Sequence, residues 1–224
     1  MTGPLANQTA LVTGAASGIG AALSRELAAQ GAHVILTDRQ DELGADVLAA
    51  ITSAGGSGEY HSLDVTDLDA WQQLAADVLA RHDGLDYLFN NAGIGVGGEV
   101  KKMSAEDWQQ IVDVNIHGVI NGVQAFYPGM VARRSGHIIN TASAAGLGPT
   151  PLSVAYCATK HAVVGLSTSL RAEASTEGVK VSVLCPGVIR TPILDGGKYG
   201  RIVGFDAQKL VDMWEIARPM DVDK

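Results

Sequence analysis

A tyrosine and a lysine four residues apart are the residues in this chain best suited to chemistry. Tyr156 and Lys160 lie in the segment 155–161, and Ser143 precedes them. In a helix, positions i and i+4 share a face, so the ammonium group can lie beneath the phenol. A tyrosine ionises near pH ~10, and a nearby positive charge lowers that pKa by favouring the phenolate. The three residues therefore predict a group that exchanges a proton near neutral pH.

The size of the required pKa shift indicates a second positive charge at the site. Lowering the pKa of a tyrosine by about 3 units takes about 4 kcal/mol, at about 1.36 kcal/mol per unit. One lysine partly in water would not supply this, whereas an oxidised nicotinamide ring beside it could complete the shift. Taken alone, the pair has a second interpretation, an amphipathic helix with a solvated lysine.

The beginning of the chain predicts a phosphate-binding turn. The apolar run 9–13 leads into Gly14-x-x-x-Gly18-x-Gly20, and a helical pattern follows. Glycines let the backbone approach an anion, and a helix N-terminus supplies free N–H groups and a positive dipole. The spacing differs from the Gly-x-Gly-x-x-Gly dinucleotide fingerprint. A turn without a ligand is the alternative interpretation.

The end of the next apolar run favours NAD as the ligand of this turn. Residues 33–37 are followed by Asp38, an acid placed to bind the hydroxyls of an adenosine ribose. The same carboxylate would repel the additional phosphate of NADP, and Ala15 and Ala16 place no cation in the turn. Arg39 is the opposing signal, since an arginine there could pair with that phosphate. We therefore predict NAD, with NADP as the alternative.

Together these motifs resemble the short-chain dehydrogenase/reductase family, in its core, short-length type. The resemblance covers about residues 5–191 and is implied, in chain order, by Thr13-Gly14-x-x-x-Gly18-x-Gly20, Asn90-Asn91-Ala92-Gly93, Asn115, Ser143, Tyr156-x-x-x-Lys160 and Pro186-Gly187. It implies an oxidoreductase that transfers a hydride between NAD(H) and a secondary alcohol or ketone. NADP-linked reduction of larger carbonyl compounds and a dinucleotide-binding protein without catalysis are the alternatives.

The resemblance also implies a role for each site residue. Tyr156 would exchange the proton with the substrate oxygen, Lys160 would lower the pKa of Tyr156, and Ser143 would donate a hydrogen bond to the substrate. Asn115 would hold a water that links the lysine to solvent. The residues expected to bind the cofactor are Gly14, Ser17, Gly18, Ile19, Gly20, Asp38, Arg39, Asp64, Val65, Asn91, Ala92, Gly93, Tyr156, Lys160, Pro186, Gly187, Ile189 and Thr191. For Asp64, a turn acid before a helix is an equally good interpretation.

Alternating strand and helix patterns predict an α/β fold with a doubly wound, Rossmann-like parallel sheet. Strands are expected at 9–13, 33–38, 59–63, 85–89, 137–141 and 179–184, and helices at 107–130, at 152–177 and from an N-cap at Thr66 to 81. The expected strand order is 3-2-1-4-5-6, with the ligand crevice at the carboxyl ends of the strands. The last strand of the family is not expected here, which would leave the sixth strand as an exposed edge.

Composition restricts the function classes further. The 224 residues fit one domain, 1–224, with 46% hydrophobic and 18% charged residues. The net charge of −8 and the lack of a Lys/Arg-rich run argue against nucleic acid or an anionic membrane as a partner. No apolar stretch could span a bilayer, the first strand leaves no room for a cleavable signal, and the two cysteines are expected to be reduced. These features predict a cytoplasmic protein.

The sequence predicts the substrate and the partners only as broad classes. Small or apolar residues at 94–98, 145–147 and 188–205 predict a pocket for a neutral, hydrophobic substrate, and the glycines in 188–205 predict a lid. None of the six histidines has metal-ligand spacing to a partner, so no metal is expected. A homodimer or homotetramer formed through the two long helices is expected.

Overall fold

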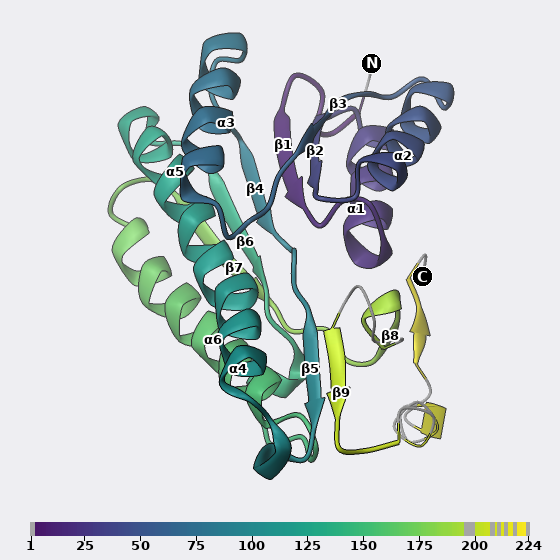
Figure 1. Ribbon diagram of the computed structural model, residues 1–224. Coiled ribbons are helices and arrows are strands. Elements are labelled where there is room, and N and C mark those ends of the chain that lie inside the picture. Colours follow the sequence, from purple (N-terminus) through teal and green to yellow (C-terminus); the bar gives the residue numbers. More distant parts are fainter. Residues whose placement is uncertain are drawn as a thin grey trace.

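A six-stranded parallel sheet forms the centre of the protein (Figure 1). The computed structural model describes residues 3–194, 200–206, 209, 212, 215–216 and 219–222. The strand order is β3-β2-β1-β4-β6-β7, which confirms the predicted order 3-2-1-4-5-6 because the short β5 lies outside this sheet. The strands are β1 (Thr9–Thr13), β2 (His33–Asp38), β3 (Ser57–Ser62), β4 (Tyr87–Asn90), β6 (His137–Thr141) and β7 (Lys180–Leu184).

Helices cover both faces of this sheet (Figure 1). One face carries α1 (Gly18–Ala29) and α2 (Asp41–Ser53), and the other carries α3 (Leu68–Arg81), α5 (Gly118–Arg133) and α6 (Val154–Ala174). The strands are buried from both sides, as in other parallel sheets with helical crossovers. This explains why β1 and β2 read as continuous apolar runs in the sequence.

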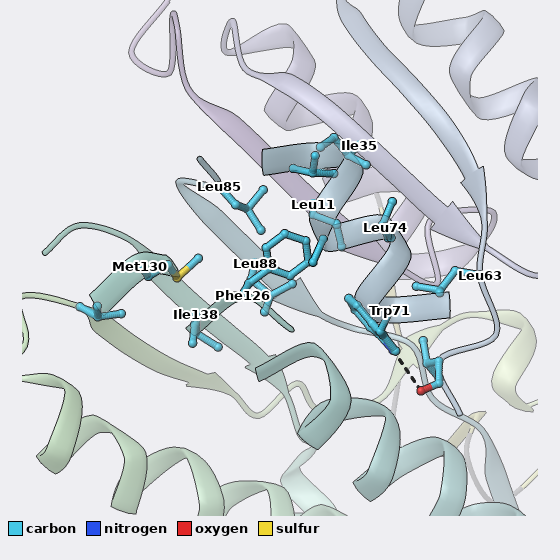
Figure 2. Packing of buried hydrophobic residues seen from close by; sticks show 14 of the residues in the cluster. Leu11, Ile35, Leu63, Trp71, Leu74, Leu85, Leu88, Phe126, Met130 and Ile138 are labelled. Carbon is cyan, nitrogen blue, oxygen red and sulfur yellow. Dashed lines mark hydrogen bonds between the residues drawn. The ribbon is translucent and has the colours of Figure 1, made fainter. Parts of the chain in front are cut away.

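Successive residues of each strand enter two different cores. Leu11 of β1 packs with Trp71 of α3 and Phe126 of α5, whereas Ala10 and Val12 face α1 and α2. Figure 2 shows the first core, in which the Trp71 indole N–H donates a hydrogen bond of 3.1 Å to the carbonyl oxygen of Val65. Satisfying that polar group allows the largest side chain of the core to be fully buried.

Two predictions on the helices were wrong in detail. The N-cap of α3 is Asp67, whose carboxylate accepts a hydrogen bond from the Ala70 N–H, and Thr66 bonds instead to Asp64. The predicted long helix 107–130 is divided into α4 (Ala105–Val112), a π-helical turn at Asp113–His117, and α5. A π-turn inserts one residue into the helical repeat and is frequent at functional sites.

A second, small sheet was not predicted. It pairs β5 (Gly95–Gly98) with β9 (Gly200–Val203) in parallel. A side chain at Gly200 would collide with the carbonyl oxygen of Gly95, and both Gly98 and Gly200 have positive φ angles. Glycine-rich strands of this kind lack the apolar pattern by which strands are recognised in a sequence.

Residues 220–222 lie near α1, not beside β7 (Figure 1). Met220–Asp221 (β10) pairs with Ile189–Arg190 (β8), and Arg190 forms an ion pair of 2.6 Å with Glu215. Within the described part of the chain, β7 is therefore the terminal strand of the large sheet. Of the predicted lid, 188–205, residues 195–199 lie outside the described residues.

Among the residues that the structure describes, no helix has both the length and the apolar character that a membrane span needs.

Candidate active site

A cavity at the carboxyl ends of the large sheet brings the predicted site residues together. Its lining includes every predicted cofactor-binding residue except Gly20, together with Ser143, Tyr156 and Lys160. Gly20 and Asn115 lie behind the cavity wall. The wall also contains residues that were not predicted, among them Gln40, Val114, Thr141 and Ser153.

The glycine turn leaves the N-terminus of α1 open toward the cavity. Gly14 and Gly18 have φ angles of +68° and +51°, which suit glycine, and the N-cap residue Ser17 makes no side-chain capping bond. The first turn of α1 contains no acidic residue. Its backbone N–H groups and positive dipole therefore fit the pyrophosphate of a dinucleotide.

Gly20 is required because the turn leaves no space for a side chain at this position. A Cβ atom there would collide with the carbonyl oxygen of Gly14 and lie 2.7 Å from the side-chain nitrogen of Asn91. The third glycine of the motif therefore allows α1 to pack against the turn, and its effect on a ligand is indirect.

Asp38 is held rigidly at the end of β2. Asp38 is only 9% exposed, and its two carboxylate oxygens accept hydrogen bonds of 3.1 Å from the backbone N–H groups of Ala16 and Gln40. One of these bonds joins the carboxylate to the glycine turn. The position fits a ribose that lies across the end of β2.

The two consecutive asparagines after β4 have different tasks. The side chain of Asn91 donates to the carbonyl oxygen of Thr13, whose hydroxyl accepts bonds of 2.9 Å from the Asn91 and Ala92 N–H groups. Asn90 points into the core and donates a 2.9 Å bond to Asn140. Thr13 is thus a positioning residue of the cofactor side that was missing from the predicted set, although it directly precedes Gly14.

Tyr156 and Lys160 lie on one face of α6, as the spacing predicted. The Lys160 ammonium nitrogen is 5.6 Å from the centroid of the Tyr156 ring and donates a 2.9 Å hydrogen bond to the carbonyl oxygen of Thr141. The lysine is 3% exposed. Ser143 begins a 3₁₀ turn after β6, and its hydroxyl accepts a hydrogen bond from the Ala145 N–H.

Burial dominates the pKa values of this pair. It raises the pKa of Tyr156, and a hydrogen bond from Ser143 opposes this effect. Burial also lowers the pKa of Lys160 to about 8, against a smaller opposing effect of Cys185. In the protein alone, burial holds the pKa of Tyr156 above its usual value, and a positive charge bound in the cavity would lower it.

Asn115 links the π-turn to the segment after β4. Its side-chain oxygen accepts from the Ile94 N–H at 2.8 Å, and its amide donates to the Ile94 carbonyl at 3.0 Å and to the Thr159 hydroxyl at 3.2 Å. It is fully buried, 3.2 Å from where a Cβ of Gly93 would lie. These bonds give the unfavourable mid-helix asparagine its structural task; a role in holding water stays a prediction.

We expect Asn115→Ala to lower the free energy of unfolding by about 3 kcal/mol, because it leaves the buried N–H and C=O of Ile94 without partners. Urea denaturation measures this loss. Gln109→Ala removes only an exposed bond to Asp113 and should change stability by less than about 0.5 kcal/mol. Equal effects of the two substitutions would contradict the structural role of Asn115.

The outer part of the cavity is apolar apart from one ion pair. Ile94, Val96, Ile193 and Ile202 contribute to its wall. Arg201 also lines it, and its Nε lies 3.1 Å from a carboxylate oxygen of Asp107, which is 1% exposed. No spacing in the sequence relates these two residues, since β5–β9 pairing brings them together.

Known proteins resemble this chain in sequence. The family model described as short chain dehydrogenase matches residues 8–198. A 2,5-dichloro-2,5-cyclohexadiene-1,4-diol dehydrogenase of Sphingobium indicum is 39% identical over 193 residues, which are 86% of this chain and 77% of that protein.

Two solved structures resemble the fold and contain nicotinamide dinucleotides. A metagenomic short-chain oxidoreductase in complex with NADP has a TM-score of 0.79 at 35% identity, covering 98% of this chain and 92% of the other. A short chain dehydrogenase/reductase from Burkholderia phymatum in complex with NAD has a TM-score of 0.83 at 30% identity, covering 99% and 90%.

Proposed function

The chain belongs to the short-chain dehydrogenase/reductase family, and on this basis we propose that it is an NAD(H)-dependent oxidoreductase that interconverts a secondary alcohol and a ketone. The observation that carries the proposal is one cavity lined by the glycine turn, Asp38, Ser143, Tyr156 and Lys160. A bound dinucleotide would supply or accept the hydride, and the side chains of the cavity would manage the proton.

Each catalytic side chain has a task that its position supports. The Tyr156 hydroxyl donates a proton to the substrate oxygen during reduction and its phenolate accepts one during oxidation. Ser143 donates a hydrogen bond to the same oxygen and stabilises the charge that develops on it. Lys160, fixed by the Thr141 carbonyl, stabilises the phenolate and can reach ribose hydroxyls. Asn115 positions the segment that begins at Ile94.

The substrate that suits this cavity is neutral and hydrophobic. Its outer wall is mainly aliphatic, and the charge of Arg201 is balanced by Asp107. The name of the Sphingobium relative denotes a cyclic diol as substrate, which supports the same class. Cyclohexanol should therefore be oxidised with a higher kcat/KM than lactate, and a preference for lactate would contradict this part of the proposal.

NAD is the proposed cofactor because the buried Asp38 carboxylate faces the ribose position. We expect NADH to bind at least tenfold more tightly than NADPH in a fluorescence titration. Asp38→Ala should weaken NADH and strengthen NADPH, each by about tenfold, because it removes both a hydrogen-bond acceptor and a repulsive charge. Asp46→Ala, on the exposed side of α2, makes the same change in net charge and should alter neither affinity.

The titration and a turnover assay together separate the two alternatives. Tighter binding of NADPH by the wild-type chain would favour the NADP-linked carbonyl reductase. NADH binding without turnover of any alcohol or ketone in a panel would favour the non-catalytic dinucleotide-binding protein. All four expected catalytic residues are present around the cavity, which argues against a protein that binds the dinucleotide without catalysis.

The proposal extends to location and assembly. Cys157 and Cys185 are both free thiols, which supports a reducing compartment such as the cytoplasm. Assembly through α5 and α6 as a homodimer or homotetramer stays a proposal, and sedimentation equilibrium of the purified chain tests it.

A further inference from the structure

Two histidines and a glutamate converge at the end of the sheet that is remote from the cavity. His33 is the first residue of β2, whose last residue is Asp38 of the cavity; Glu59 lies in β3, and His82 directly follows α3. One donor atom of each of the three lies within 4.8 Å of those of the other two. The three residues come from separate segments, and we refer to them as the His33–Glu59–His82 cluster.

Both imidazoles of the cluster present a buried nitrogen that has no hydrogen-bond partner among the described residues. These atoms are Nε2 of His33 and Nε2 of His82. An unpaired buried polar atom is costly, and native proteins rarely retain one without a reason. The His82 Nε2 lies 3.7 Å from Glu59 Oε1, so both nitrogens are next to a carboxylate. A cation bound between these three groups would give each nitrogen a partner.

The surroundings orient the ligands as metal sites do. The Nδ1 of His33 lies 2.7 Å from the hydroxyl of Ser57 on the neighbouring strand. If Nδ1 carries the proton, the lone pair of Nε2 is directed away from Ser57 and is available to a metal. A hydrogen bond on the second ring nitrogen is the usual device that fixes the orientation of a histidine ligand.

The charged side chains near the cluster carry an excess of negative charge, which favours the binding of a cation. Arg81 binds both oxygens of Glu59 and also forms a 2.7 Å ion pair with Asp77. Two carboxylates therefore face one guanidinium group, with an excess of one negative charge while the histidines are neutral. His61, whose Nε2 is 3.3 Å from a carboxylate oxygen of Glu59, is a further titratable neighbour of the cluster.

We propose that the His33–Glu59–His82 cluster binds a zinc ion, with Nε2 of each histidine and one oxygen of Glu59 as ligands and water in a fourth position. Two histidines and one glutamate form an established donor set for zinc. At metal–ligand distances of about 2.1 Å, tetrahedral ligands lie about 3.4 Å apart, so donors that lie within 4.8 Å of one another need to approach by up to about 1.4 Å. The ion would link β2, the edge strand β3 and the end of α3, and would thereby stabilise the folded protein.

Zinc titration of the chain, expressed without a polyhistidine tag and treated with EDTA, tests the proposal. Competition with a chromophoric chelator should show one zinc ion per chain, and His33→Gln or His82→Gln should each weaken binding at least tenfold. His137→Gln is the matched control, because His137 also begins a strand and is half-buried but has its Nε2 2.8 Å from the Ser182 hydroxyl. It should bind zinc as the wild type does.

Two further measurements make the result independent of the variants' stability. Cobalt(II) bound to the wild-type chain should give the strong visible absorption of a tetrahedral site with nitrogen and oxygen ligands, and saturating zinc should raise Tm by about 4 °C. Affinity unchanged in both His33→Gln and His82→Gln, or no stoichiometric binding by the wild type, would overturn the proposal. NADH binding, at the other end of the sheet, should not respond to zinc in any variant.

Discussion

Replacing Tyr156 by phenylalanine should lower kcat about 1000-fold while the affinity for NADH changes less than about threefold. The phenol oxygen is the only part removed, and general acid–base catalysis contributes factors of about 10² to 10⁴. The cavity contacts of the ring and of Lys160 remain, so the dinucleotide site should stay intact. Steady-state rates and a fluorescence titration of the same preparation measure the two quantities.

Tyr127→Phe provides the control for this substitution. Tyr127 lies on α5, and its buried hydroxyl has no hydrogen-bond partner among the described residues. Removing that hydroxyl should leave kcat unchanged. Full turnover in Tyr156→Phe would refute the assignment of the proton donor, and a parallel loss of NADH binding would instead indicate damage to the cavity.

The pH dependence should have opposite signs in the two directions of the reaction. Burial raises the pKa of Tyr156, so the phenol stays the dominant form up to a higher pH than in a free tyrosine. Alcohol oxidation requires the phenolate and should become faster as the pH rises through the pKa of Tyr156 in the complex. Ketone reduction requires the phenol and should become slower over the same range. Rates that rise with pH in both directions would contradict proton exchange at Tyr156.

Replacing Lys160 by methionine should remove most turnover and yet stabilise the protein. Burial lowers the pKa of Lys160 from 10.5 to about 8, so keeping this ammonium charged in the folded state is unfavourable at pH 7. At about 1.36 kcal/mol per unit, relief of this penalty is worth about 3 kcal/mol, and loss of the hydrogen bond to Thr141 offsets about 1 kcal/mol. We expect the free energy of unfolding to increase by about 2 kcal/mol.

The same shift predicts how this gain depends on pH. The penalty is fully present below pH 8, and it disappears as the pH rises toward 10.5 because the folded state then releases the proton first. The difference in stability between Lys160→Met and the wild type should therefore shrink across this range. Lys180→Met, on the exposed start of β7, should change neither stability nor turnover. A destabilised Lys160→Met protein at pH 7 would refute the unfavourable burial of this charge.

The catalytic lysine would then be a residue retained for function at the expense of stability. Such residues are typical of active sites, where groups are held in environments that the folded state alone does not favour. The bound dinucleotide would compensate for part of this penalty, which would make ligand-dependent stability a sensitive measure of site integrity.

Local patterns predicted most of the fold and of the site because both depend on short segments. The two continuous apolar runs, the glycine turn and the acid that follows β2 each express a requirement of only a few neighbouring residues. The parallel sheet then places the ends of its strands at one edge, so residues that follow each strand meet in one cavity. The i,i+4 spacing similarly determined that Tyr156 and Lys160 share a face of α6.

Other features could be seen only in the tertiary structure because they depend on contacts between distant segments. The β5–β9 sheet brings Arg201 to Asp107, and the packing of α1 explains Gly20. The adjacent Asn90 and Asn91 look equivalent in the sequence, yet the direction of each side chain at the strand end sends one into the core and the other toward the glycine turn. Spacing along the chain likewise gave no indication of the His33–Glu59–His82 cluster, because its ligands meet only through strand register and the end of α3. The sequence thus determined the sheet order and most of the side chains that surround the cavity, whereas long-range packing decided which polar groups became buried, paired or brought together.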